Sequence, residues 1–273
     1  MILVNGKPEN RIAVTDRGLQ YGDGLFETIA FRHGVAEFID AHLQRLIAGC
    51  KRLNIPFQQL DSLCKELEFI YQSLSDTDSV IKIIITRGSG GRGYFADKSI
   101  EPTRIISTHD YPSYPESNSQ TGVTVLLCQH KLPENPALAG LKHLNRLDNV
   151  LARNEWDDID IAEGLMLDQS NNLIEGTMSN VFVVKSEQLI TPLLNKSGVE
   201  GIMRAQIIAV AKQLGLAFKE STVTFDALKN ADEVFICNSV NGIWPVIAVK
   251  DIAKYTLGPI THQLQQALFK VKR

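Results

Sequence analysis

The sequence has few cysteines and no long apolar run, and each absence excludes a class of protein. The four cysteines are scattered and form no Cys-x-x-Cys pair (Cys50, Cys64, Cys128 and Cys237). We therefore expect reduced thiols in a cytoplasmic protein, with neither a disulfide framework nor a metal site. No stretch approaches the roughly 18 apolar residues of a membrane span. The first residues lack the basic region of a signal peptide, so we expect none.

A strong charge of one sign and internal repeats are also missing. The formal net charge is −3, which gives no electrostatic reason to expect nucleic acid or an anionic membrane as a partner. The chain does have 273 residues, of which 44% are hydrophobic, and this is enough for a packed core in one large domain or two modest ones.

A polar segment with two prolines, residues 111–119, is the best candidate for a domain boundary because proline disrupts regular structure. We predict an N-terminal domain over residues 1–112, a linker over 113–120 and a C-terminal domain over 121–273. Periodicity and turn residues predict strands at 28–32, 35–39, 80–86, 122–128, 165–168, 173–175, 181–184, 234–237 and 244–249, and helices at 40–53 (capped by Asp40), 60–74, after 142, 202–214 and the C-terminus. Hairpins and helices are mixed in this order, so we expect an α+β fold rather than one doubly wound parallel sheet.

A glycine-rich loop follows one of these strands. Residues 88–93 have the spacing Gly-x-Gly-x-x-Gly of a dinucleotide-binding fingerprint. That fingerprint requires a helix that begins in the loop and faces the pyrophosphate. The next residues have no helical apolar period and include Pro102. We therefore set aside a nicotinamide oxidoreductase and interpret the loop as a mobile flap that carries Arg92.

Lys142 has an unusual setting. It follows an apolar turn, residues 136–141, and lies beside the first core position of a predicted helix whose apolar residues share one face (Leu144, Leu147, Val150 and Leu151). Burial lowers the pKa of a lysine and lets it attack as a free amine. A solvated lysine is the alternative.

Three further features indicate a binding site only when they are taken together. Glu175 ends a predicted strand just before a turn, although it also fits the role of an ordinary turn acid. Ile202 and Met203 open a helix whose backbone N–H groups can bind phosphate, as every helix start can. Arg45 lies one helical turn after His42 and could equally be a surface charge.

These positions occur in an order known from one family. Residues 16–28 resemble the N-terminal signature of fold-type IV pyridoxal-phosphate enzymes, the group of branched-chain and D-amino-acid aminotransferases. The other motifs of that group are matched in the same order by residues 42–46, 142–145, 174–182, 201–204 and 238–240. The resemblance covers almost the whole chain.

The resemblance implies a homodimer of two-domain α+β subunits with pyridoxal 5'-phosphate between the domains. It implies that Lys142 forms a Schiff base with this cofactor. It also implies that Glu175 keeps the pyridine nitrogen protonated. The residues implied for the phosphate are Arg45, Ile202, Met203, Asn238 and Ser239.

Two stretches, residues 87–94 and 135–147, resemble the aminodeoxychorismate lyases of this family more than its aminotransferases. This implies a small-molecule substrate, 4-amino-4-deoxychorismate, which would yield pyruvate and 4-aminobenzoate for folate. Lys142 would remove the proton from ring carbon 4, and Thr28 would help to protonate the departing group. We expect Arg92 and Tyr94 to bind a substrate carboxylate across the dimer interface. The alternatives are an aminotransferase for branched-chain or D-amino acids and a binding protein that kept the fold without activity.

Overall fold

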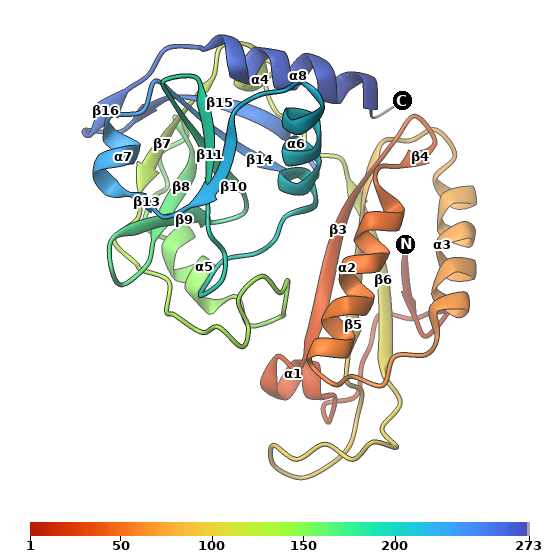
Figure 1. Cartoon of the computed structure of the whole chain (residues 1–273). Helices are drawn as coiled ribbons and strands as arrows, with labels where there is room; N and C mark the ends of the chain where they lie inside the picture. The colour runs from red at the N-terminus through yellow and green to blue at the C-terminus, as the bar shows by residue number, and fades with distance from the viewer. Residues whose placement is uncertain (272–273) are drawn as a thin grey trace. The chain divides into compact units, whose positions relative to one another are not determined.

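The computed structural model describes residues 1–271, and contacts within the chain divide it into two compact units. The first unit comprises Met1–Pro112 together with Lys142–Asn145, and the second comprises Ser113–Leu141 and the chain from Arg146 onward (Figure 1). The short segment with Lys142 thus belongs to the first unit, although the residues on either side of it belong to the second. Both units combine a sheet with helices, so the predicted α+β class is confirmed.

The first unit is a six-stranded antiparallel sheet in the order β2-β1-β6-β5-β3-β4. Two long helices, α2 and α3, lie beside it (Figure 1). The strands are β1 Ile2–Val4, β2 Lys7–Pro8, β3 Gly24–Arg32, β4 Val35–Ala36, β5 Ser79–Thr86 and β6 Thr103–Asp110. The helices are α1 Arg17–Tyr21, α2 Ile39–Arg52 and α3 Leu60–Leu74.

Side chains alternate between the two faces of β3 and β5. Ile83 and Ile85 are fully buried on one face, where Leu25 of β3 is the cross-strand partner of Ile85. Leu25 packs on α2 at Gly49, where an added Cβ atom would lie 2.7 Å from the leucine side chain. Phe26 and the residues that alternate with it therefore face away from α2.

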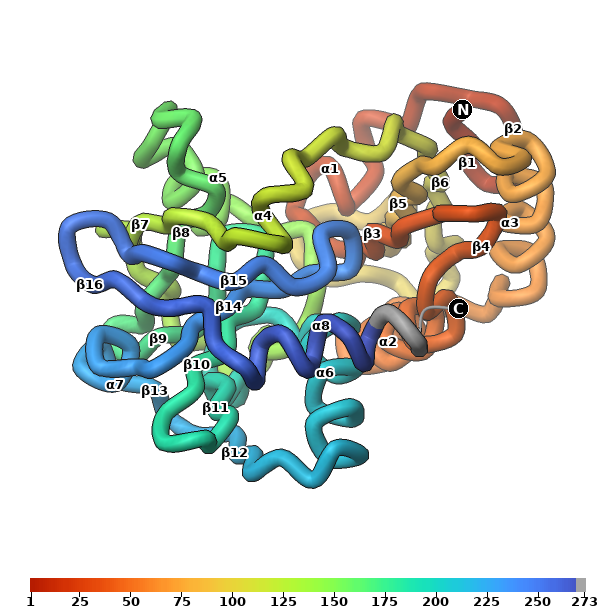
Figure 2. Tube along the Cα trace, turned by 90° about the horizontal axis from the view of Figure 1, so that it is seen from above, coloured from red at the N-terminus to blue at the C-terminus, as the bar shows by residue number. Residues whose placement is uncertain are grey.

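The second unit is a ten-stranded mixed sheet in the order β12-β11-β10-β14-β15-β7-β8-β9-β13, with β16 paired to β15. Its strands are β7 Val123–Leu127, β8 Ile161–Leu167, β9 Asn172–Gly176, β10 Asn180–Lys185, β11 Gln188–Pro192, β12 Phe218–Ser221, β13 Val223–Thr224, β14 Glu233–Asn238, β15 Gly242–Val249 and β16 Ala253–Lys254. Its helices are α4 Ser117–Gln120, α5 Leu147–Arg153, α6 Ile202–Gln213, α7 Phe225–Lys229 and α8 Pro259–Val271. Helices α6 and α8 pack on each other and on β14 (Figure 2).

Two local expectations were wrong. Residues 117–120 lie inside the predicted linker but form the helix α4, because both prolines precede this segment and remove no N–H group from it. Asp40 does not cap α2. The helix begins at Ile39, after Phe38 in a left-handed conformation, and Asp40 lies within its first turn.

The helix expected directly after Lys142 begins later, at Leu147. Its apolar side chains do not face a core in this chain, since Leu147, Val150 and Leu151 are 76%, 50% and 55% exposed. The physical reason is that residues 142–145 form extended backbone hydrogen bonds with β3 instead of starting the helix. In contrast, the described structure has no helix after the glycine-rich loop, as expected, and the chain continues into β6.

No helix in the described part of the chain is both long enough and apolar enough to span a membrane.

Candidate active site

Lys142 lies next to β3 in the first unit. Its carbonyl accepts a hydrogen bond from Phe26 N at 3.0 Å, and Leu144 N donates to Gly24 O at 3.0 Å. The side chain is half-buried, and its Nζ atom lies 4.2 Å from the centroid of the Phe26 ring. A cation at this distance from an aromatic face is attracted by the ring quadrupole, so Phe26 helps to fix the position of the amine.

Thr28, the predicted proton donor, lies on the same face of β3 as Phe26 because the two are separated by one residue. Its cross-strand partner in β5 is Lys82, whose Nζ atom lies 5.3 Å from the same Phe26 ring. The structure therefore brings the amino groups of Lys142 and Lys82 to the Phe26 ring, on the face of β3 that carries Thr28.

Arg45 belongs to a largely buried cluster on the α2 side of β3, and the charge of Lys142 reaches this cluster at His42. Its Nε and Nη2 atoms donate to the two carboxylate oxygens of Glu27 at 2.8 and 2.5 Å, and His42 Nδ1 lies 2.6 Å from Glu27 Oε2. Burial alone would raise the pKa of Glu27, but the hydrogen bonds from His42 and Arg45 outweigh it, and the pKa lies below its usual value. Burial lowers the pKa of His42, although the hydrogen bond with Glu27 opposes this shift.

The glycine-rich loop forms a flap, defined as residues 87–102, between β5 and β6 of the first unit. Arg92 and Tyr94 lie at its exposed end, where Tyr94 is 88% exposed. Asp97, a nearby acid of the flap, accepts hydrogen bonds from the backbone and hydroxyl of Ser99 at 2.8 and 2.6 Å. The structure places Arg92 in the same unit as Lys142.

Glu175 lies on β9 in the second unit and is 3% exposed. Its Oε2 atom accepts a hydrogen bond from Val199 N at 2.8 Å. Glu175 also interacts electrostatically with Arg146. Burial lowers the pKa of the Arg146 guanidinium, and the negative charge of Glu175 opposes that shift. Glu175 is thus a buried, oriented carboxylate rather than an exposed turn acid.

Ile202 and Met203 form the first turn of α6, with Gly201 as N-cap. Gly201 has no side chain that could cap this helix start, so its first N–H groups need another acceptor. Only glycine fits at position 201, because an added Cβ atom would lie 1.9 Å from Asn180 Oδ1. Asn180 is held in turn by its hydrogen bond to Val199 O at 2.8 Å.

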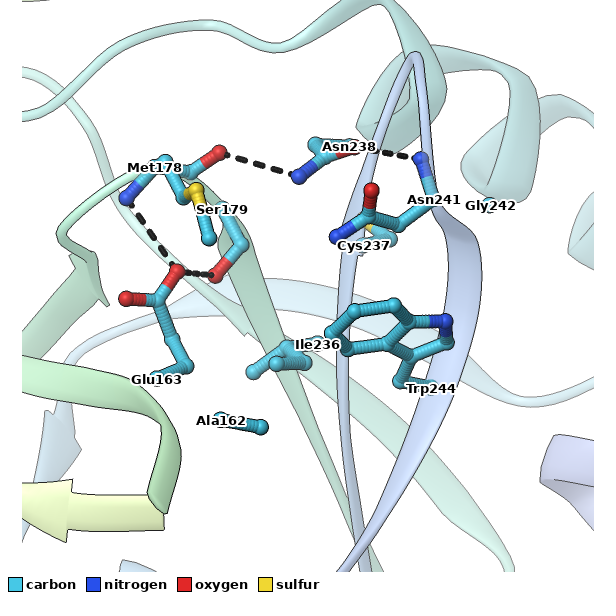
Figure 3. A pocket seen from close by; sticks show the side chains of 10 residues that line it. All are labelled: Ala162, Glu163, Met178, Ser179, Ile236, Cys237, Asn238, Asn241, Gly242 and Trp244. Atoms are coloured by element: carbon cyan, nitrogen blue, oxygen red, sulfur yellow. Dashed lines mark hydrogen bonds between the residues drawn. The ribbon is translucent and has the colours of Figure 1, made fainter. Parts of the chain in front are cut away.

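Asn238 ends β14 and shapes the turn that contains Ser239. Its Oδ1 atom accepts from Val240 N and Asn241 N at 2.9 and 2.7 Å, and its Nδ2 atom donates to Met178 O at 3.3 Å. Figure 3 shows Asn238 facing Met178 across a pocket of the second unit. The turn after β14 is thereby fixed to the turn after β9.

Glu163 supports the turn after β9 from below (Figure 3). It is 1% exposed, and its carboxylate accepts hydrogen bonds from Thr177 Oγ1 at 2.5 Å, Ser179 Oγ at 2.8 Å and Met178 N at 3.2 Å. Sequence reasoning missed this residue. The available signal was a carboxylate within a strand whose other residues are mostly apolar, which requires a buried partner.

Sequence reasoning also missed Glu27 and Lys82. Both interrupt apolar strands, and strand alternation could have assigned Glu27 to the helix-facing side and Lys82 to the opposite side. Their partners come from distant parts of the chain, so neither the pairing with Arg45 nor the approach to Phe26 could be read from local sequence.

Fold and site together define the class of protein. Residues 24–249 match the model of the Amino-transferase class IV family, and the chain belongs to that family.

Within the family, the chain is similar to aminodeoxychorismate lyases. It is 36% identical to the aminodeoxychorismate lyase of Vibrio harveyi over 97% of this chain and 98% of that protein. The crystal structure of 4-amino-4-deoxychorismate lyase from Pseudomonas aeruginosa is 45% identical, with a TM-score of 0.95 and coverage of 99% and 98% of the two chains. The branched-chain amino acid aminotransferase of Escherichia coli is 27% identical, with a TM-score of 0.87 and coverage of 99% and 94%.

Pyridoxal phosphate is the cofactor of this chain, as family membership and the similarity to the lyases show. The residues present fit this group. An aldehyde requires an amine, and Lys142 is a half-buried lysine. A protonated pyridine nitrogen requires an acceptor, and Glu175 is a buried carboxylate. A phosphate requires N–H donors, and the start of α6 offers them.

Proposed function

We propose that this chain is a pyridoxal-phosphate lyase that converts 4-amino-4-deoxychorismate into 4-aminobenzoate and pyruvate. The observation that carries the proposal is full-length similarity to two lyases, at 36% and 45% identity, compared with 27% for the branched-chain aminotransferase. The grouping of Lys142, Thr28 and Lys82 on one face of β3 and β5 also supports it. We also propose that the product 4-aminobenzoate serves folate synthesis.

Lys142 and Thr28 have the proton-moving roles in this proposal. The amine of Lys142 removes the proton from ring carbon 4, and the bond between ring carbon 3 and the ether oxygen breaks. The ring becomes aromatic, and the departing enolpyruvate takes up one proton from the Thr28 hydroxyl to become pyruvate. The Lys142 ammonium returns a proton to Thr28, so the step balances. The cofactor, when bound, supplies the electron sink that makes the proton at carbon 4 removable. Phe26 keeps the Lys142 amine at the sheet face that carries Thr28.

Six residues are proposed to hold the cofactor in addition to Lys142. Glu175 would pair with the pyridine nitrogen, because a buried carboxylate stabilises a proton there. The phosphate would be held by Arg45, by the N–H groups of the α6 start and by the turn after β14 (Ile202, Met203, Asn238 and Ser239). Glu27 supports this role of Arg45 by orienting its guanidinium.

The substrate carries two carboxylates, and burying either without a cation would be prohibitive. The first unit offers two candidates. Arg92 at the end of the flap can bind a carboxylate through two parallel hydrogen bonds, with Tyr94 beside it. Lys82 lies on the Phe26 face, where Lys142 also points.

We further propose a cytoplasmic homodimer. The apolar side chains of α5, with Leu147 76% exposed, and Phe95 of the flap, 79% exposed, are surfaces that a second copy would bury. The cysteines of the described chain are free thiols, which suits a reducing compartment.

A substrate panel tests the proposed activity. Purified protein is given aminodeoxychorismate alone, and separately branched-chain or D-amino acids with a keto acid. The proposal predicts 4-aminobenzoate and pyruvate in the first reaction with no keto acid added. Efficient amino transfer in the second reaction, with no 4-aminobenzoate in the first, would establish the aminotransferase alternative instead.

A further inference from the structure

The side chain of Arg17 is buried between α1 and the flap. Only 3% of it is exposed, although it belongs to a short helix at the surface of the first unit. Its guanidinium donates in three directions: Nε to Asp23 Oδ2 at 3.0 Å, Nη1 to Gly93 O at 3.0 Å and Nη2 to Tyr94 O at 2.9 Å. One cation thus binds two successive carbonyl groups of the flap.

The ends of the flap are held by the same short segment. Arg17 N donates to Gly88 O at 2.9 Å, and Asp23 accepts from Arg87 Nε and Nη2 at 2.6 and 3.0 Å. Asp16 accepts from Thr103 Oγ1, just past the other end of the flap, at 2.9 Å. The chain before β3 therefore contacts the beginning, the tip and the end of the flap.

The tip of the flap has a further contact through its aromatic residue. The rings of Tyr21 and Tyr94 meet edge to face with centroids 5.6 Å apart, and the guanidinium of Arg17 lies 4.9 Å from the Tyr21 ring. Tyr94 is nevertheless 88% exposed. The backbone of the tip is thus hydrogen-bonded to Arg17, while the Tyr94 side chain remains exposed.

We propose that Arg17 is a positioning residue that holds the flap in place so that Arg92 and Tyr94 meet the substrate carboxylate in a preformed arrangement. This inference rests on the proposed substrate-binding role of the flap. A flap that is already ordered does not lose conformational entropy when substrate binds, so its anchor strengthens binding without contacting the substrate. Lysine could not replace Arg17, because a single nitrogen cannot reach Asp23 and both carbonyl groups in the directions of a planar guanidinium.

The test compares Arg17→Lys with Arg32→Lys, both as holoenzymes. Arg32 is also an ion-paired arginine of the first unit, and its partner is Glu37. It is the last residue of β3, at the end of the strand opposite to Gly24. Three quantities are measured: trypsin cleavage after Arg92, the visible absorbance of bound cofactor, and the KM and kcat for aminodeoxychorismate.

We expect Arg17→Lys to be cleaved after Arg92 about tenfold faster or more, and its KM to rise roughly ten- to a hundredfold, the effect of losing one or two charge-assisted hydrogen bonds. Its kcat and visible absorbance should stay close to those of the wild type, and Arg32→Lys should match the wild type throughout. A role confined to folding would not separate KM from kcat in this way.

Cleavage and KM equal to those of the control would overturn the proposal, and so would faster cleavage with unchanged KM. Asp23→Asn weakens the carboxylate that orients both Arg17 and Arg87, and it provides the same test if Arg17→Lys does not fold. If the wild type makes no 4-aminobenzoate, the proposed function fails separately. The KM is then measured for the amine that the wild type does use, with the same expected rise and the same contradicting result.

Discussion

The carboxylate of Glu163 should contribute more to the stability of the second unit than an exposed acid does. The substitution Glu163→Gln tests this prediction. The side chain is 1% exposed and accepts five hydrogen bonds. Its Oε1 atom accepts from Gly164 N and from the N and Oγ1 of Thr177, and its Oε2 atom accepts from Met178 N and Ser179 Oγ. Glutamine keeps the shape but replaces one acceptor oxygen with a donor.

The magnitude follows from these five bonds. If the amide oxygen takes the place of Oε1, the amide nitrogen faces Met178 N and Ser179 Oγ. The serine hydroxyl can rotate and accept, but the part-buried Met178 N–H is left opposite another donor. One unsatisfied N–H and the loss of charge assistance in the remaining bonds together cost about 2–4 kcal/mol. This corresponds to a decrease in melting temperature of roughly 5–10 °C.

Glu155→Gln is the matched control, because Glu155 also accepts backbone hydrogen bonds, from Gln129 N and His130 N at 2.6 and 2.8 Å, but is exposed. Water can replace those bonds, so we expect a loss below about 1 kcal/mol. Thermal unfolding is followed by circular dichroism, and the Kd for cofactor by visible absorbance. Only Glu163→Gln should weaken cofactor binding, because Met178 O is bonded to Asn238 in the proposed phosphate loop. Equal melting temperatures for the two variants would refute the reasoning.

Three other predictions concern the first unit. Borohydride reduction should attach the cofactor permanently to the peptide that contains Lys142, and label on another lysine would exclude the assignment. Arg92→Ala should reduce kcat/KM about ten- to a hundredfold with an unchanged cofactor spectrum, and mixing it with Lys142→Ala should restore activity in heterodimers if the flap acts across the dimer. No recovery after demonstrated subunit exchange would show that it does not. Because the pKa of His42 is lowered, its contribution to stability is complete above about pH 6.5 and is lost as the pH falls through its lower folded value. His42→Asn should therefore flatten the decrease in the free energy of unfolding between pH 7 and 5, measured by urea denaturation, by at most about 1.4 kcal/mol per pH unit, and an unchanged slope would mean that folding does not lower the pKa of His42.

Much of the fold could be predicted because the apolar periodicity agrees with the final packing. The continuous β-branched residues of β5 and the repeating leucines of α3 each predict their element, and the antiparallel β8–β9 hairpin follows from its turn. Strand β6 was missed. Its burial alternates only in part, and its pairing with β5 is set by the distant register of Ser79 with Asp110.

The site could be predicted only where residues lie close together in sequence. Gly201 and Ile202 form a helix start that local pattern reveals, and the structure has it. The position of Lys142 could not be inferred, because its segment pairs with β3, whose residues Gly24 to Phe26 are more than 100 positions earlier. The helix predicted after Lys142 begins only at Leu147 for the same reason, since tertiary hydrogen bonds of residues 142–145 overcame local helical preference. The apolar side chains of this helix, such as the exposed Leu147, fit burial by another chain rather than by this one.

The central claim, elimination by Lys142, is tested most directly by following product and cofactor in one reaction. Excess aminodeoxychorismate is added to the wild type and to Lys142→Ala, and 4-aminobenzoate, pyruvate and pyridoxamine phosphate are measured over time. The wild type should release the two products in equal amounts with no pyridoxamine phosphate, and Lys142→Ala should release neither. Accumulation of pyridoxamine phosphate in the wild type, or undiminished product from Lys142→Ala, would contradict the account.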